Sequence, residues 1–569
     1  MAYDLVIKNG TIIDGTGAPR YRADIAIAGG AIAEIGKVRD GAQRTIDASD
    51  LIVAPGFFDP HTHYDAQMCW DPLITCSSWH GVTSIVMGNC GVGIAPCRPK
   101  DREVATWDLV NVEGIPFDVL NRGITWDWQS FPEFMDAASR RGSALNLGFL
   151  APLTPFRHMV MGQESMERAA NAQERAEIKA LLKEAVGAGA VGFSLTRVRQ
   201  HIGYQGRPLA CRLADREELK AYSNALRELG KGTIEIALNQ DLSLVTDEEA
   251  ELLDFMLTQS ARPVTWLGLA PTSGRGDAYV ETLRKMAPYM ERGGIPQVIA
   301  YPSEPQFSMR NPFLLASIES WQQVFNQPAE AQKGIYRDPA FRNAFREALK
   351  TPQIFAGRWD RVRIDEVGDP ALKHIEGRMV AEVARDRGAD GLDTFLDLAI
   401  EDDLRIRYAV TNRGEDRLAG LIKDPRTLVG QADGGAHVDM ICMAGYPTHM
   451  IGTWVREKEL MTLEEGVRRL TSQPADLFGF PQRGRIAAGA AADIAIFDYD
   501  NIGCAKRPES RHDLPGGGLR LVTTSRGVEY TIVNGEVLYD HGQHTGALPG
   551  QVLRSRKLDP HKLDPSKLD

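Results

Sequence analysis

The sequence predicts an α/β protein, with a (β/α)8 TIM-like barrel and a small β-sandwich domain built from both chain termini. Along the middle of the chain, short apolar strands alternate with helical stretches, which is the pattern of a parallel barrel. At both ends, short strands of alternating apolar and polar residues carry Asn-Gly hairpin signals. A chain of 569 residues is too long for a single small hydrophobic core, and its length suits a barrel with a companion domain.

The companion domain is expected from two separate segments. Residues 1–53 contain short strands around the turn Asn9-Gly10. Residues 481–556 contain strands with a similar residue pattern around the turn Asn534-Gly535. Neither segment alone has enough strands for a stable core. We therefore expect the two segments to pair into one β-sandwich.

The barrel is expected over residues 54–480. Its eight strands are predicted just before His61 and at 83–87, 145–150, 190–195, 233–238, 264–269, 298–300 and 427–430. Segments 176–186 and 215–229 space their apolar residues three and four apart, as helices do. Catalytic groups of such barrels lie at the carboxyl ends of the strands.

Two segments lie outside this regular pattern. Residues 304–426 form a long, charged and helical excursion between the last two strands, which predicts a lid or a wall of the substrate pocket. The alternative is that residues 304–426 are a helical insertion without a role in substrate binding, or a contact between subunits of an oligomer. Residues 557–569 repeat Lys-Leu-Asp-Pro and are expected to form a flexible tail.

The bulk composition excludes several classes of partner. A net charge of -11 without a long basic run argues against nucleic acid and anionic membranes. Seven cysteines scattered over the chain indicate a reducing compartment rather than a disulfide framework. Neither a signal-peptide pattern nor a stretch of membrane-span length is found. We expect a soluble cytoplasmic protein, with oligomerisation left open.

His61-Thr62-His63 is the principal candidate for chemistry. Alternation along a strand puts the two imidazoles on one face, about 7 Å apart, where they can converge on one cation. An isolated His-X-His is as often a pair of structural histidines. Its position directly after an apolar strand favours the metal.

The same segment carries a family resemblance. Residues 54–63 resemble the signature of the amidohydrolase superfamily, whose metal-dependent hydrolases carry this histidine pair on the first barrel strand. Residues 88–91, the region of Asp433 and residues 546–554 are similar to the D-aminoacylase (N-acyl-D-amino-acid deacylase) branch. The resemblance covers nearly the whole chain.

Asp433 and Cys90 are the next candidates. Asp433 follows the eighth predicted strand, where a carboxylate can ligate a metal and take a proton from water. An Asp-Gly-Gly alone is usually a turn, but the resemblance gives Asp433 the catalytic role. Cys90 read alone is a small buried hydrophobe. The resemblance makes it a metal ligand, and thiolate suits zinc.

The sequence also departs from the branch. D-aminoacylases carry two further metal histidines on strands five and six, whereas residues 234–240 and 264–269 contain none. The family's lysine after strand six and its arginine after strand eight are missing too. Arg310 or Arg197 are the cations that remain as partners for a substrate carboxylate.

These departures shape the expected site. We expect one tightly bound zinc ion, and a weak second ion through Glu235 and Asn239 stays open because the two side chains share a strand face. The expected metal ligands are His61, His63, Cys90 and Asp433. The expected substrate-binding residues are Tyr301, His437, Trp266 and Arg310.

The predicted function is that of a metal-dependent amidohydrolase that cleaves a linear N-acyl amide, such as an N-acyl amino acid, by metal-activated water. A hydrolase of cyclic amides or esters on the same fold is one alternative. A catalytically degenerate barrel that acts as a binding protein is another, because fold alone does not establish activity. The retention of His61, His63 and Asp433 favours an enzyme.

Overall fold

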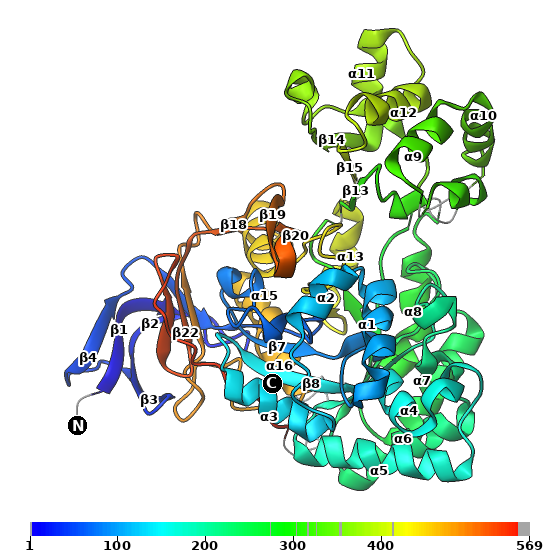
Figure 1. Cartoon of the computed structure of the whole chain (residues 1–569). Coiled ribbons are helices and arrows are strands. Elements are labelled where there is room, and N and C mark those ends of the chain that lie inside the picture. Colours follow the sequence, from blue (N-terminus) through cyan, green and yellow to red (C-terminus); the bar gives the residue numbers. More distant parts are fainter. Residues whose placement is uncertain are drawn as a thin grey trace. The chain divides into compact units, whose positions relative to one another are not determined.

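The computed structural model describes residues 3–272, 275–302, 304–315, 318–325, 327–351, 355–411 and 415–555. The tail predicted at 557–569 lies outside the described residues. The chain forms two compact units. The first comprises Met1–Tyr301, Asp416–Val438 and Cys442–Asp569, and the second comprises Pro302–Glu415 and Asp439–Ile441. Figure 1 shows their secondary structure.

The first unit contains the predicted parallel barrel. Its strands follow one another in chain order and are β6 (Phe57–Asp59), β7 (Val82–Met87), β8 (Asn146–Pro152), β9 (Gly192–Thr196), β10 (Thr233–Ala237), β11 (Val264–Leu267), β12 (Gly294–Val298) and β16 (Leu428–Val429). A parallel bridge between Thr62 and Gly434 joins the chain just beyond the first and last strands. The His63 N–H donates to the Gly434 carbonyl over 2.7 Å there. The barrel predicted from sequence is therefore confirmed.

Helices cover the barrel strands, as expected for βα units. They are α1 (Arg102–Glu113), α2 (Phe117–Gly123), α3 (Phe131–Arg141), α4 (Leu153–Met161), α5 (Ala172–Ala188), α6 (Arg216–Leu229), α7 (Asp247–Ser260), α8 (Ala278–Met290), α13 (Ala419–Lys423), α14 (Tyr446–His449), α15 (Leu463–Leu470) and α16 (Ser472–Leu477). The helices predicted at 176–186 and 215–229 correspond to α5 and α6. Asn171 caps α5 through a capping box with Glu174, and Asp215 caps α6.

Strands from both chain ends build the second domain of this unit. They are β1 (Tyr3–Ile12), β2 (Tyr21–Ala28), β3 (Ala31–Gly36), β4 (Ala42–Asp47), β5 (Ile52–Pro55), β17 (Ile494–Phe497), β22 (Val528–Val533), β23 (Glu536–Asp540) and β24 (Gln543–His544). They form one nine-stranded sheet, in which the antiparallel pair β5–β17 joins the two ends. Figure 1 shows β1 to β4 from the start of the chain in the same domain as β22 from its end. Ile32 exchanges backbone hydrogen bonds with Gly489 and Ala490, so the sheet folds back around one apolar core. The prediction of a β domain from both termini is confirmed.

The rest of the first unit holds two short antiparallel pairs. β18 (Gly503–Cys504) pairs with β21 (Ser525–Arg526), and β19 (Glu509–Leu514) pairs with β20 (Gly518–Val522). None of the helices in the described ranges is long and apolar enough to cross a membrane.

The second unit has its own small sheet and core. Its sheet has the order β13 (Gln306–Ser308), β15 (Arg407–Val410) and β14 (Val362–Glu366), and its helices are α9 (Ala329–Arg337), α10 (Pro339–Ala348), α11 (Val380–Arg387) and α12 (Gly391–Glu401). Aromatic side chains fill its interior, among them Phe307, Trp321 and Phe395. A role as a lid stays a prediction.

Candidate functional site

Two buried histidines stand at the end of the first barrel strand. His61 and His63 follow β6, are at most 2 % exposed, and bring their Nε2 atoms to 3.3 Å from each other. His61 Nδ1 lies 2.7 Å from Gln297 Oε1 on β12. Because that amide oxygen can only accept, Nδ1 carries the hydrogen and the Nε2 lone pair of His61 faces the site.

Carboxylates hold His63 at both of its ring nitrogens. Glu113 Oε1 lies 3.3 Å from His63 Nδ1, and Asp433 Oδ1 lies 3.3 Å from His63 Nε2. Glu113 is the last residue of α1, and Gly114 ends that helix in the left-handed conformation. The sequence did not single out Glu113, because a helix-terminal glutamate before glycine carries no local sign that it faces a histidine.

Cys90 and Asp433 reach the same histidines from two other strands. Cys90 Sγ lies 3.7 Å from His61 Nε2, and Asp433 Oδ1 lies 3.5 Å from that same atom. A Cβ on Gly91 would come within 2.6 Å of Leu195 Cα, so only glycine lets this loop approach the barrel wall. The structure thus brings all four predicted ligands together.

The spacing of these donors suits zinc. Ligand atoms of His61, His63 and Cys90 lie within 4.8 Å of one another. A tetrahedral centre with bonds of about 2.0–2.3 Å has ligand–ligand edges of about 3.3–3.7 Å. The measured contacts of 3.3, 3.5 and 3.7 Å fall in that range. Glu235 Oε1 is also buried without a hydrogen-bond partner, which a nearby cation would satisfy.

Charge interactions separate the roles of the acidic groups. Burial raises the pKa of Asp433, but its hydrogen bond and charge interaction with His63, and then the charge of His61, outweigh burial and hold that pKa well below its usual range. Burial lowers the pKa of His63, yet Glu113 and Asp433 together raise it to about 10. Burial lowers the pKa of His61 to about 4. Asp433 is therefore ionised at neutral pH.

Comparisons with known proteins agree with this geometry. A model of the amidohydrolase family matches residues 44–539. The chain belongs to the amidohydrolase family. It is 27% identical to an N-acyl-D-glutamate deacylase of Alcaligenes xylosoxydans xylosoxydans, over 97% of this chain and 96% of that protein. It is 26% identical to a D-aminoacylase of the same organism, over 97% of both chains.

Solved structures share the fold of this amidohydrolase. An N-acyl-D-glutamate deacylase from Bordetella bronchiseptica, complexed with zinc and a phosphonate mimic of the tetrahedral intermediate, superposes with a TM-score of 0.65 at 24% identity and covers 98% of this chain and 100% of its own. A D-aminoacylase crystal structure superposes with a TM-score of 0.67 at 22% identity, covering 97% of this chain and 100% of its own. These likenesses establish the barrel with its β domain.

Glu235 occupies the fifth strand of this amidohydrolase, where the resemblance leads one to expect a histidine. Its Oε2 accepts the Cys90 backbone N–H over 2.7 Å, and its Oε1 is buried without a partner. Burial raises the pKa of Glu235 to about 8. The Asn239 amide donates to the carbonyls of Asp241 and Gly268. Both side chains are buried, Glu235 within β10 and Asn239 just beyond it, and the expectation that they share one face stays a prediction.

The predicted substrate-binding residues have different surroundings. The backbone N–H of His437 donates to the Glu113 carbonyl, which places His437 beside the histidine cluster. Trp266 is fully buried on β11 with an unpartnered Nε1. Tyr301 packs edge-on against His449 with ring centroids 5.1 Å apart. Arg310 belongs to the second unit, where it donates to Gln332 and to the Gln327 carbonyl.

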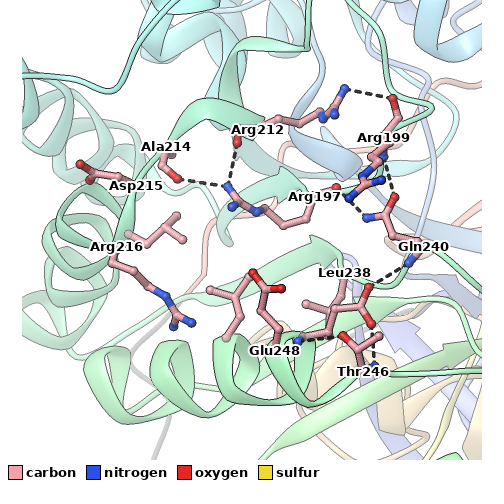
Figure 2. Close-up of a pocket in the computed structure, with 13 residues that line it drawn as sticks. Arg197, Arg199, Arg212, Ala214, Asp215, Arg216, Leu238, Gln240, Thr246 and Glu248 are labelled. Atoms are coloured by element: carbon pink, nitrogen blue, oxygen red, sulfur yellow. Dashed lines mark hydrogen bonds between the residues drawn. The ribbon is translucent and has the colours of Figure 1, made fainter.

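Arg197 lies in a cavity of about 600 Å³ at the ends of β9 and β10 (Figure 2). Its Nη1 donates to the carbonyls of Arg212 and Ala214 over 2.7 and 3.1 Å, as Figure 2 shows. Arg197 thus braces the segment that leads into α6. Its role as a partner for a substrate carboxylate stays a prediction.

His201 is a further residue that the sequence did not single out. Its Nδ1 is buried without a hydrogen-bond partner. Burial, and next the charges of His437 and His63, lower its pKa to about 3. A neutral imidazole therefore faces the site from the loop after β9. A single histidine in an irregular loop gives no sequence signal for such a position.

Proposed function

We propose that the protein is a zinc-dependent hydrolase that cleaves the carbon–nitrogen bond of a linear N-acyl amide, an N-acyl amino acid or a related compound. The observation that carries this proposal is the contact of Asp433 Oδ1 with both imidazoles, at 3.3 and 3.5 Å, at the carboxyl end of the barrel. The deacylase activities named for the relatives support the same reaction class.

Four side chains of the barrel would hold the ion. His61 offers the lone pair of its Nε2 and Asp433 its Oδ1, and His63 and Cys90 would offer Nε2 and Sγ once the ion displaces their protons. When bound, a zinc ion there supplies an activated water and polarises the substrate carbonyl. Gln297 and Glu113 fix the two rings through their outer nitrogens, which orients the lone pairs that face the ion.

Asp433 would carry the proton between water and the leaving nitrogen. Its carboxylate stays ionised at neutral pH, because His63 and His61 hold its pKa well below the usual range despite burial. In its ionised form Asp433 has the free oxygen needed to take a proton from the attacking water, which it would then donate to the departing amine. The left-handed conformation of Asp433, with φ 52°, turns it back toward the histidines beyond β16.

We propose one tightly held zinc ion. A D-aminoacylase with a binuclear centre, described as showing one-metal activation and second-metal attenuation, shares the fold. In this chain Glu235 and Asn239 offer only oxygen or amide donors on the fifth strand, and these bind zinc more weakly than imidazole or thiolate does. A second ion would therefore be weak.

The substrate is proposed to be a small amide. Arg310 and Arg197 each use Nη1 for hydrogen bonds within the protein, which leaves their other N–H groups as the proposed donors to a substrate carboxylate. Trp266 alternates along β11 with Thr265, whose hydroxyl faces Gln297 inside the barrel, so Trp266 gives no support for a particular acyl group. A cyclic amide or an ester is the alternative within the same chemistry. Seven unpaired cysteines support a cytoplasmic location.

The test is amine release by zinc-loaded protein across N-acyl amino acids, lactams and esters. We expect hydrolysis of at least one N-acyl amide, its loss on chelation, and its return with zinc. Preferential hydrolysis of lactams or esters would transfer the assignment to the alternative class. If the zinc-replete protein hydrolyses none of the compounds in the panel, the enzyme assignment is overturned and a binding protein is favoured.

A further inference from the structure

Two thiols outside the metal cluster face each other. Cys76 Sγ and Cys442 Sγ are 3.5 Å apart, although 366 residues separate them in sequence. Among the hydrogen bonds found in the described ranges, this is the one that joins two cysteines. Cys76 lies in the segment after β6 and His63, and Cys442 lies in the segment after β16 and Asp433.

The surroundings of Cys442 favour a thiolate. Its sulfur contacts the Cys76 sulfur over 3.5 Å, and the Thr523 hydroxyl donates to the Cys442 backbone carbonyl over 3.4 Å. The contact with Cys76, first of all, holds the pKa of Cys442 below that of an ordinary thiol in spite of burial. The same pairing, together with burial, raises the pKa of Cys76. Cys442 is half-buried, whereas Cys76 is 4 % exposed.

Cys442 is thus a partly exposed cysteine with a lowered pKa, and Cys76 is the neighbouring thiol that would attack an oxidised Cys442 to form a disulfide. Reactive cysteines have a lowered pKa and partial exposure, and those that sense oxidants stand next to a resolving cysteine. Disulfide formation requires the sulfurs to close from 3.5 Å to about 2.05 Å. Neither cysteine lies within a helix or strand, so a closure of this size needs only local loop movement.

We propose that Cys76 and Cys442 form an oxidisable dithiol, which a small hydroperoxide such as hydrogen peroxide converts into an intramolecular disulfide. The Cys442 thiolate attacks one peroxide oxygen, the O–O bond breaks, and the released hydroxide leaves as water after taking a proton. Cys442 then carries a sulfenic acid. The Cys76 sulfur attacks it, the S–S bond forms and the S–O bond breaks. The Cys76 proton leaves with the second water, so two thiols are oxidised and one peroxide is reduced.

The bond would tie together the segments that lead away from the two catalytic strands. Tyr64, next to His63, hydrogen-bonds through its hydroxyl to Ser77, next to Cys76, over 2.8 Å. A Cβ on Gly434, next to Asp433, would lie 2.5 Å from that same hydroxyl. The dithiol therefore sits at a junction where both segments already touch.

The experiment uses the zinc-loaded full-length protein, treated with one equivalent of hydrogen peroxide at neutral pH. We expect the loss of two free thiols per chain and a cross-linked peptide pair that contains Cys76 and Cys442 with a deficit of two hydrogen atoms. Dithiothreitol should restore both thiols. Unchanged thiol content, or a sulfinic acid at Cys442 without the cross-link, would overturn the proposal.

Three variants separate this pair from general thiol oxidation. Cys69→Ser is the matched control, because burial raises the pKa of that half-buried thiol, and it should leave the cross-link intact. Cys442→Ser should abolish peroxide consumption. Cys76→Ser should leave a sulfenic acid on Cys442 that dimedone traps. If either variant fails to fold, the order of iodoacetamide labelling in wild-type protein decides, since Cys442 must react before Cys69.

Discussion

Replacing Asp433 by asparagine isolates proton transfer from folding and from metal binding. Asp433 Oδ1 lies 3.3 Å from His63 Nε2 and 3.5 Å from His61 Nε2, and the residue adopts φ 52°. Asparagine has the same shape and tolerates the left-handed region better than other side chains do. Asp433→Asn therefore keeps the backbone and an oxygen near both imidazoles, but it removes the group that accepts a proton.

The expected loss follows from the role of a general acid–base. Such groups contribute about 10²–10⁴-fold, which is about 2.7–5.5 kcal/mol of activation free energy. We expect kcat for amine release to fall by that factor, with zinc content and the melting temperature near wild type. Asp433→Ala is the poorer probe, because a strained non-glycine φ costs of order 1 kcal/mol of stability as well. A fully metallated Asp433→Asn protein within about tenfold of the wild-type rate would refute the assignment.

Three further outcomes are expected. Protein purified without added metal should hold one zinc per chain by elemental analysis and lose it in His61→Ala; two equivalents that survive a mild chelator would contradict the one-ion site. Gln297→Leu removes the acceptor of His61 Nδ1–H at 2.7 Å and should weaken zinc affinity about 10–100-fold in a chelator competition, whereas an unchanged affinity would show that the amide does not orient the ring. Burial lowers the pKa of His80 from 6.5 to about 4, so its stabilising effect is complete above 6.5 and is lost as the pH falls toward 4. In urea unfolding, the free energy of unfolding of the wild type should therefore fall by up to about 1.4 kcal/mol per pH unit in that window relative to that of His80→Gln. Parallel pH profiles for the two proteins would contradict this prediction.

The features that the sequence predicted are those with a local signature. His61 and His63 follow an apolar strand directly, so alternation alone places their rings on one side. Asp433 and Cys90 were assigned through their position after predicted strands, together with the family resemblance. Closure of the barrel then brings these separate strand ends together, as the Thr62–Gly434 bridge shows.

The features that the sequence missed depend on contacts between distant elements. Glu113 ends α1 and reaches His63 only because that helix returns over the first strand's end. Gln297 belongs to β12, which runs over Gly294–Val298, although the sequence predicted this strand at 298–300. Pro296 lacks a backbone N–H and obscured the strand. His201 lies in an irregular loop, where the sequence has no periodic pattern of apolar residues from which its position could be predicted.

The charge balance of the site distinguishes Asp433 from its acidic neighbours. Burial raises the pKa of Asp59 to about 8, of Glu113 to about 7 and of Glu235 to about 8. Asp433 alone among these has its pKa lowered, because its oxygen contacts both imidazoles. A divalent cation would stabilise the ionised forms of the others as well. The site thus suits a cation, and Asp433 is the carboxylate among these that is ionised at neutral pH.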